Sequence, residues 1–239
     1  HQRTYQQLRK RVSAIILALS ILMLLSGCGP VETDIRGETM GTTYSIKVMT
    51  GRFDSTDHLP ELIKKRLEEI NNSMSTYIED SEISSFNKMR ENIPFTPSAD
   101  FLEVMRVAMD IHEMSDGAWD GSLDPLVTLW GFGREGTRGE VPTKGEIEES
   151  LALVDFSRLK ISNDGSFTKT DPDLTIDLAS IAKGYGVDAI ARVLESEGYS
   201  DFLVEVGGEI FASGRKDANN SWRVGINTPT STAGFRQVY

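Results

Sequence analysis

Residues 174–198 constrain the fold more than any other segment, because an apolar stretch leads into a carboxylate and then into a long helical pattern. Leu174 to Ile176 are typical of the end of a buried strand, and Asp177 stands where that strand would stop. From Ser180 the spacing of apolar residues predicts a helix that extends to Gly198. The chain is therefore expected to contain both sheet and helix.

The same segment suits a bound phosphate and its metal ion. The first turn of a helix has free N–H groups and the positive end of the helix dipole, both of which favour anions. Lys183 would add a positive charge there. The alternative is an ordinary strand-to-helix turn with an aspartate cap and a solvated lysine, and this segment alone fits both interpretations.

Strand patterns occur at both ends of the remaining sequence. Polar and apolar residues alternate from Thr42 to Val48, as in a half-buried strand. Further strands are predicted over 202–206 and 222–226, and a hairpin is predicted to pair 159–161 with 166–168 around an Asn-Asp-Gly turn.

Helix patterns lie between these strands. Helices are predicted from Pro60 to Met74 and over 98–115, 124–130 and 143–154, the last with a capping box of Thr143 and Glu146. Strands mixed with helices, without a strict strand–helix–strand alternation, predict an α+β fold.

The N-terminal segment resembles an export signal. Three basic residues at 9–11 precede an apolar run over 12–25, which is too short for a comfortable membrane span. The run ends in Leu-Ser-Gly-Cys, which resembles the bacterial lipoprotein cleavage box with Cys28 as the lipid-bearing residue, for example as a palmitate carrier. We therefore expect a signal peptide over 1–27 and a tether over 28–36. The alternative is a plain membrane anchor with an incidental cysteine.

Charge and cysteine content exclude several classes of function. The net charge is −11, and loss of the four basic residues of the signal would move it to −15. A chain this acidic does not bind nucleic acid through general electrostatics. Cys28 is the single cysteine, so it has no disulfide partner and no companion thiolate for a metal site.

Two further patterns carry little weight. Gly131 to Gly136 match the spacing of a dinucleotide-binding loop, but they follow an apolar helix and cannot open another one. His58 and His112 lie far from any residue spaced for a catalytic triad or a zinc site, which makes hydrolase and zinc chemistry weak hypotheses.

Four segments favour a bound ligand over a purely structural role. Met40 lies among glycine and small hydroxyl residues, where its thioether could lie against a flat ring. Tyr77 follows the first long helix, and Trp119 and Asp120 lie between glycines at a helix end. With the segment around Asp177, these residues suit a planar heterocycle that carries a diphosphate.

In these motifs the chain resembles the ApbE family, the FAD:protein FMN transferases. The matching motifs are, in order, Thr39-Met40-Gly41-Thr42, Ser75-Thr76-Tyr77, Asp116–Asp120, Pro125–Gly133, Asp177–Asp188 and Val206-Gly207-Gly208. The resemblance implies a single α+β domain over 37–239 with a mixed or antiparallel sheet and flanking helices. It also explains the Trp-Gly-Phe-Gly run as a family feature unrelated to dinucleotide-binding folds.

The resemblance further implies an enzyme that binds FAD with Mg²⁺, cleaves its pyrophosphate, attaches FMN to a threonine of a membrane redox protein and releases AMP. The residues that would contact FAD by this resemblance are Met40, Tyr77, Ala118, Trp119, Asp120, Asp177 and Lys183. Ser180 would give the magnesium ion an oxygen, from its hydroxyl or its backbone carbonyl. Asp120 and Asp177 could meet either the flavin or the adenosine end.

Family members continue beyond the matched region with a His-and-Asp-Pro segment and then an Asp and a Thr that complete the metal site. Because His1 is not a methionine and Tyr239 follows no closing element, we expect this sequence to be a piece of a longer protein, inactive by itself. The location implied is the extracytoplasmic side of the cell membrane or the periplasm. Alternatives are a non-catalytic FAD-binding lipoprotein, an FAD pyrophosphatase and a scaffold without a ligand.

Overall fold

The computed structural model describes residues 29–134, 136, 138–227 and 235–238. Its main sheet has four antiparallel strands in the order β1 (Val31–Thr39), β2 (Thr42–Thr50), β5 (Phe202–Val206) and β6 (Glu209–Ser213). Alternate residues of β2 and β5 point to one buried face, which includes Ile46, Val48 and Phe202 at 0% exposure. This period of two is the pattern that predicts a half-buried strand.

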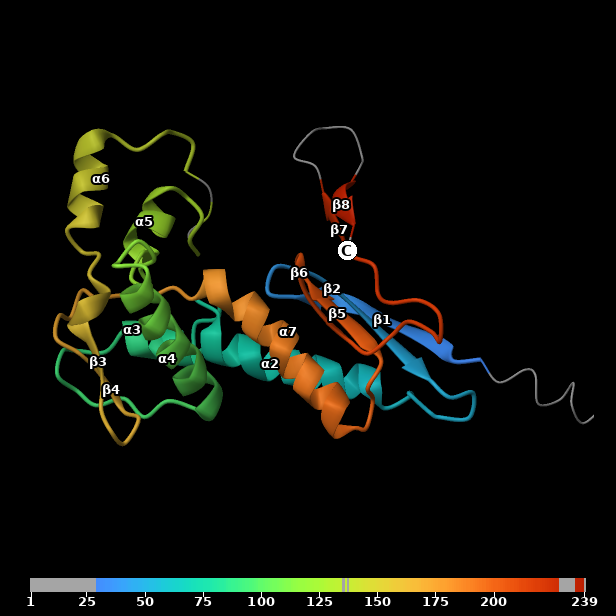
Figure 1. Ribbon diagram of the computed structural model, residues 1–239. Coiled ribbons are helices and arrows are strands. Elements are labelled where there is room, and N and C mark those ends of the chain that lie inside the picture. Colours follow the sequence, from blue (N-terminus) through green and yellow to red (C-terminus); the bar gives the residue numbers. More distant parts are fainter. Residues whose placement is uncertain (1–28, 135, 137, 228–234, 239) are drawn as a thin grey trace, which may run out of the picture.

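Two long helices, α2 (Leu59–Met74) and α7 (Ala179–Ser196), pack against each other and against the sheet (Figure 1). Their apolar stripes are shared between two hydrophobic cores. Leu59, Ile63 and Leu67 of α2 join the core under the sheet, whereas Ile70 and Met74 join a second core at the other end of the helix. The helix pair therefore connects the two halves of the molecule.

The second core contains no strand of the main sheet. It is built by α3 (Glu82–Asn87), α4 (Ala99–Met114) and the hairpin of β3 (Leu159–Ile161) and β4 (Phe167–Lys169). Four phenylalanines fill it with edge-on and stacked rings at centroid distances of 5.6–6.4 Å, a geometry that adds to simple area burial. They are Phe86, Phe95, Phe101 and Phe167.

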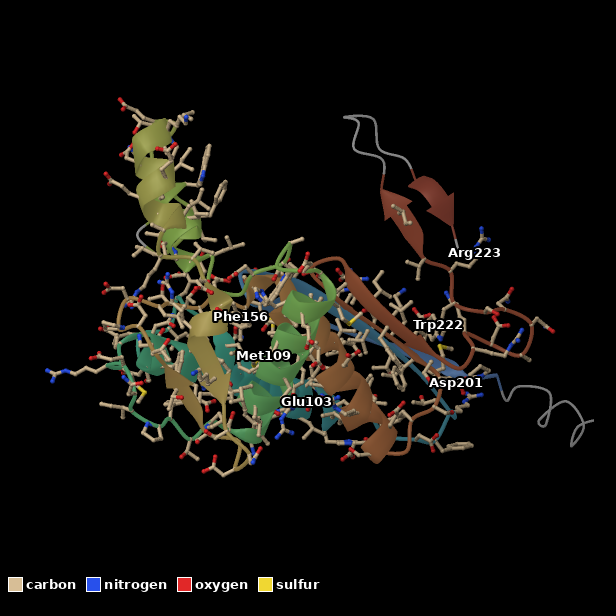
Figure 2. All side chains as sticks on the ribbon, turned by 60° about the vertical axis from the view of Figure 1, so that its left-hand side comes forward. Glu103, Met109, Phe156, Asp201, Trp222 and Arg223 are labelled. Carbon is tan, nitrogen blue, oxygen red and sulfur yellow. The ribbon has the colours of Figure 1, made fainter. Side chains whose placement is uncertain are left out.

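A projection of α5 (Asp124–Leu129) and α6 (Lys144–Leu151) extends from this half, away from the sheet (Figure 1). Neither helix contains a buried residue. The chain returns to the body at a short 3₁₀ helix, η1 (Phe156–Arg158), whose Phe156 packs edge-on against Trp119 with the ring centroids 5.8 Å apart (Figure 2). Near the C-terminal end, β7 (Gly225–Asn227) pairs with β8 (Phe235–Val238).

Most predicted elements are confirmed to within one or two residues, including the capping box of Thr143 and Glu146. The tether prediction is wrong for residues 31–36, which form most of β1 and pair with β2. Leu174 and Ile176 are buried as predicted, but residues 174–176 lie in no sheet. Residues 222–224 also precede β7 rather than belonging to it, and α3 and β6 were not predicted.

Among the described residues, no helix is long and apolar enough to cross a membrane. The predicted signal peptide over 1–27 and the predicted lipidation site Cys28 lie outside the described residues.

Candidate functional site

A cavity of about 620 Å³ opens where the two hydrophobic cores meet. Its walls come from the β1–β2 turn, the C-terminal end of α2, the loop over 75–78 and the start of α7. Four of the predicted ligand residues line it together, namely Met40, Tyr77, Asp177 and Lys183. Segments far apart in the sequence are thus brought to one place, and the size is that of a small-molecule site.

Met40 occupies the β1–β2 turn with a left-handed backbone, at a φ of 50°. This conformation is uncommon for a residue with a side chain and points to a local constraint. The Met40 side chain packs against both cores and lies over Gly186 of α7, where an added Cβ would be only 3.0 Å from the methionine methyl group. Gly186 therefore allows the thioether to lie close to the helix.

Tyr77 is 60% exposed on the opposite wall, and its hydroxyl donates a hydrogen bond of 2.7 Å to the carbonyl of Phe132. An exposed aromatic face next to a cavity is suited to stacking against a flat ligand. Phe132 is itself 70% exposed and belongs to the Trp-Gly-Phe-Gly run, which the structure thus places beside the cavity.

Asp177 caps the start of α7, because its Oδ1 accepts a hydrogen bond of 2.7 Å from the Ala179 N–H. Its own N–H donates to the carbonyl of Gly121 at 2.9 Å, which joins it to the segment after Trp119. The N-cap position, Leu178, has no side-chain cap. The start of this 18-residue helix thus opens on the cavity with its dipole favouring an anion.

Lys183 lies one turn into α7, with Nζ 3.4 Å from the Ala179 carbonyl and 3.4 Å from Oε1 of Glu209. Its side chain is 30% exposed, so the fully solvated alternative does not describe it. Glu209 is not among the residues predicted to contact the ligand, yet its Oε2 is buried and has no hydrogen-bond partner among the described residues. The Gly-Gly pair directly before Glu209 was the one signal in the sequence that could have pointed to this residue.

Ala118, Trp119 and Asp120 do not line this cavity. The indole Nε1 of Trp119 donates a hydrogen bond of 3.1 Å to the hydroxyl of Ser180, which does not line the cavity but directly follows Ala179, which does. Asp120 instead accepts hydrogen bonds from the Ser122 N–H at 2.7 Å and the Phe156 N–H at 3.3 Å. The structure thus gives Asp120 an internal role, and its contact with a ligand stays a prediction.

Asp124 is a second acidic residue near Asp177 that sequence reasoning treated only as a helix start. Burial raises the pKa of Asp124, the charge of Asp177 adds to this effect, and a hydrogen bond from Thr175 opposes it. Two neighbouring carboxyl groups, one of them with a raised pKa, are a common feature of functional sites.

Oxygen groups at and near the start of α7 are of the kind that magnesium binds. No group of three or more His, Cys, Asp or Glu side chains within the described ranges could hold a metal ion alone. Mg²⁺, however, is commonly bound by one or two protein oxygens together with phosphates and water. The Ser180 hydroxyl and the Asp177 and Asp124 carboxylates are donors of this hard type.

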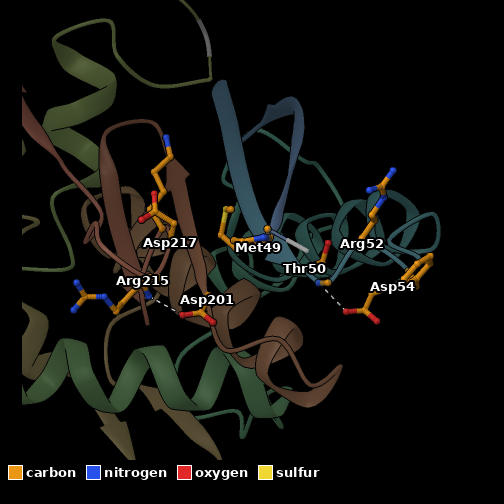
Figure 3. Close-up of a pocket in the computed structure, with 13 residues that line it drawn as sticks. Met49, Thr50, Arg52, Asp54, Asp201, Arg215 and Asp217 are labelled. Atoms are coloured by element: carbon orange, nitrogen blue, oxygen red, sulfur yellow. Dashed lines mark hydrogen bonds between the residues drawn. The ribbon is translucent and has the colours of Figure 1, made fainter. Parts of the chain in front are cut away.

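A second cavity, of about 580 Å³, lies at the other end of β1 and β2 and is bordered by Gly29, Arg52, Asp201 and Arg215 (Figure 3). Its carboxylates are engaged by backbone groups, since Asp201 accepts from the Arg215 N–H at 2.7 Å and Asp54 from the Gly51 N–H at 2.9 Å. None of the predicted ligand residues lines it, so the candidate site is the first cavity.

Comparison with known proteins gives one consistent family. The model of the ApbE family matches residues 40–239. A curated relative from Vibrio cholerae, named FAD:protein FMN transferase, is 41% identical over 90% of this chain and 65% of its own length. A Haemophilus influenzae relative of the same name is 36% identical over 94% of this chain and 67% of its own length. The chain thus spans about two thirds of the length of these relatives.

Solved structures agree with the sequence relatives. The flavin transferase ApbE from Vibrio cholerae superposes with a TM-score of 0.82 at 36% identity, over 87% of this chain and 68% of the other. The apo flavinyl transferase ApbE from Pseudomonas stutzeri gives 0.77 at 31% identity, over 83% of this chain and 64% of the other. These likenesses confirm the predicted α+β fold with an antiparallel sheet and flanking helices.

Proposed function

Because this chain belongs to the ApbE family, we propose that its protein is a magnesium-dependent FAD:protein FMN transferase. The proposed reaction cleaves the FAD pyrophosphate, attaches FMN to a threonine hydroxyl of an acceptor protein and releases AMP. The observation that carries the proposal is the single cavity that unites Met40, Tyr77, Asp177 and Lys183. The relatives named FAD:protein FMN transferase support the same reaction.

The cavity offers a separate surface to each part of FAD. The Tyr77 ring and the Met40 thioether present flat and polarizable surfaces to an aromatic ring system. The N-terminus of α7 and the Lys183 ammonium present positive charge to the diphosphate. A dinucleotide bound in this way would have its pyrophosphate held near the first turn of α7.

The Ser180 oxygen, with the carboxylates of Asp177 and Asp124 nearby, would help to hold Mg²⁺. The ion supplies positive charge that offsets the diphosphate and stabilises the charge developed during phosphoryl transfer. Lys183 contributes a fixed cation on the same side, and Glu209 limits its movement through the ion pair of 3.4 Å. Such groups act by positioning and electrostatics rather than by forming bonds.

The proposed location is the extracytoplasmic side of the cell membrane, with Cys28 as the lipid attachment site and a membrane redox subunit as acceptor. The direction of β1 bears on the attachment point alone, because β1 leads from Gly29 near the second cavity to Met40 at the candidate site. Nine strand residues correspond to about 30 Å. A lipid at Cys28 would thus attach the domain at the end remote from the FAD cavity.

Incubation of the full-length protein with FAD, Mg²⁺ and a threonine-bearing acceptor protein tests the proposal. We expect the acceptor protein to carry covalently attached FMN, seen as a yellow protein after denaturation, and one AMP to be released for each FMN attached. AMP and free FMN without a labelled acceptor would indicate a pyrophosphatase instead. Tight FAD binding without either product would indicate a flavin carrier, and the absence of binding would contradict every flavin-based function.

A further inference from the structure

Residues 174–178 cross the interior as a chain that belongs to no sheet, yet this segment delivers Asp177 to the cavity. Leu174, Ile176 and Leu178 are all 0% exposed. Buried backbone N–H and C=O groups need hydrogen-bond partners, and a sheet normally provides them. For both backbone groups of Ile176 and for the Leu174 carbonyl, the partners here are side chains.

Asn87, the last residue of α3, takes the place of a neighbouring strand. Its Oδ1 accepts a hydrogen bond of 2.9 Å from the Ile176 N–H, and its Nδ2 donates one of 2.9 Å to the Ile176 carbonyl. The two bonds reproduce the exchange that a residue in an antiparallel ladder would make. They fix the backbone one residue before Asp177.

Lys169 holds both Asn87 and the chain that leads to Ile176. Its side chain is 1% exposed, and Nζ donates three hydrogen bonds of 2.9 Å, to the carbonyls of Asn87, Pro172 and Leu174. All three donors of the ammonium are thereby used. Lys169 thus connects the end of α3 to Pro172 and Leu174, which precede Ile176 in the chain.

Helix α3 also holds the Tyr77 loop, which forms the wall of the cavity opposite Asp177. The hydroxyl of its N-cap Ser81 donates to the Ser75 carbonyl at 2.7 Å, and the Ser84 hydroxyl donates to the Ile78 carbonyl at 2.7 Å. These bonds bracket Tyr77 on both sides. The start of α3 therefore fixes the Tyr77 loop, while its last residue fixes the Asp177 segment.

We propose that Asn87, supported by Lys169, is a positioning residue of the FAD site that sets Asp177 and the N-terminus of α7 at a fixed distance from Tyr77. This inference rests on the proposed function, because it names residues that align the two walls of the proposed FAD cavity. Asn87 itself does not line that cavity. It acts through the backbone of Ile176.

The test compares Asn87→Ala with Val104→Ala in the full-length protein. Val104 is 1% exposed in the same hydrophobic core, but it lies on α4 and makes no contact with the 174–178 backbone through a hydrogen bond. FAD affinity is measured by flavin fluorescence well below both melting temperatures. Loss of a residue that orients the ligands of a metal site costs about 10- to 100-fold in affinity or activity, and we expect a loss of this order for a residue that orients the FAD site. That loss is expected for Asn87→Ala, with affinity unchanged for Val104→Ala.

Amide hydrogen exchange provides a readout that needs no ligand. The Ile176 amide should exchange faster in Asn87→Ala and keep its protection in Val104→Ala. Asn87→Asp, which keeps the shape and the acceptor for the Ile176 N–H but not the donor, should give an intermediate loss of FAD affinity and serves if the alanine variant fails to fold.

Equal affinity losses in the alanine variants, or wild-type affinity in Asn87→Ala, would overturn the positioning role. Failure of the unmodified protein to bind FAD would contradict the proposed function and, with it, the role in FAD binding. The exchange result would then still decide whether Asn87 holds the Ile176 backbone.

Discussion

The residues at the start of α7 combine structural and chemical roles, and Asp177 is the clearest case. Its side chain caps the helix at 2.7 Å while it lines the cavity beside Lys183. A capping carboxylate satisfies one free N–H and leaves the rest of the first turn open to an anion. Substitution of Asp177 should therefore affect both stability and ligand affinity.

We expect Asp177→Ala to lower the free energy of unfolding by about 1 kcal/mol, as for other lost caps. FAD affinity should fall about 10-fold or more, since a group that orients the site is removed. Urea unfolding and fluorescence titration measure the two effects. Asp188→Ala, at an exposed position of the same helix, is the matched control and should change neither. Unchanged FAD affinity in Asp177→Ala would show that the site is assigned wrongly.

Tyr77 allows its ring to be tested separately from its hydroxyl. Tyr77→Phe removes the hydrogen bond to the Phe132 carbonyl but keeps the ring, whereas Tyr77→Ala removes both. Ring stacking contributes about 0.5–1.5 kcal/mol, so the alanine variant should bind FAD about 2- to 13-fold more weakly. The phenylalanine variant should bind nearly as well as the unmodified protein in the same titration. Equal losses would assign the effect to the hydrogen bond rather than to stacking.

At the scale of elements, a charged network holds α2, α4 and α7 together. The Arg66 guanidinium contacts Asp100 through two hydrogen bonds of 2.5 and 2.8 Å, and the Tyr185 hydroxyl donates to the same carboxylate at 2.7 Å. The hydrogen bonds from Arg66 lower the pKa of Asp100 against the opposing effect of burial. A bidentate pair of this kind restrains direction as well as distance.

We expect Asp100→Asn to destabilise the fold by about 1.5 kcal/mol near neutral pH. The pKa of Asp100 is lower in the folded than in the unfolded protein, so the stabilisation is complete above the ordinary value of 3.8 and is lost as the pH falls through the folded-state pKa. Urea unfolding of both proteins should therefore converge in acid. Glu68→Gln, in an exposed pair on α2, should have almost no effect. A pH-independent difference for Asp100→Asn would contradict this explanation.

The sequence predicts elements whose apolar residues keep a regular period, and α2, α4, β2 and β5 are confirmed for that reason. It fails where tertiary contacts replace a local pattern. Residues 174–176 are predicted as a strand because Leu174 and Ile176 are apolar. In the structure, Asn87 supplies the hydrogen bonds that a neighbouring strand would have given. Short α3 has too few residues for a clear period, and β1 is largely exposed and polar, so it resembles a tether.

The site was predicted in part for a similar reason. Met40, Tyr77, Asp177 and Lys183 converge on one cavity as the ligand hypothesis requires. The pairing of Lys183 with Glu209 and the partial burial of Asp124 depend on distances across the fold that no spacing in the sequence encodes.

At the scale of the whole molecule, lipidation of Cys28 is a separate prediction. We expect the protein made in a bacterial host to incorporate an alkyne-labelled fatty acid and to fractionate with membranes. Cys28→Ser should abolish the label, while Val31→Ser, at the exposed start of β1, should keep it. Equal labelling of Cys28→Ser would place the lipid elsewhere, whereas membrane fractionation of the unmodified protein without any label would support a plain membrane anchor.

The central claim is that FAD binds where the two cores meet, with its diphosphate at the start of α7. A crystal structure of the full-length protein soaked with FAD and Mg²⁺ tests this most directly. We expect the diphosphate to lie against the first turn of α7 beside Lys183, with an aromatic ring of the ligand against Tyr77. FAD bound at the cavity near Arg52 and Arg215, or a cavity at α7 that stays empty at saturating FAD, would contradict it.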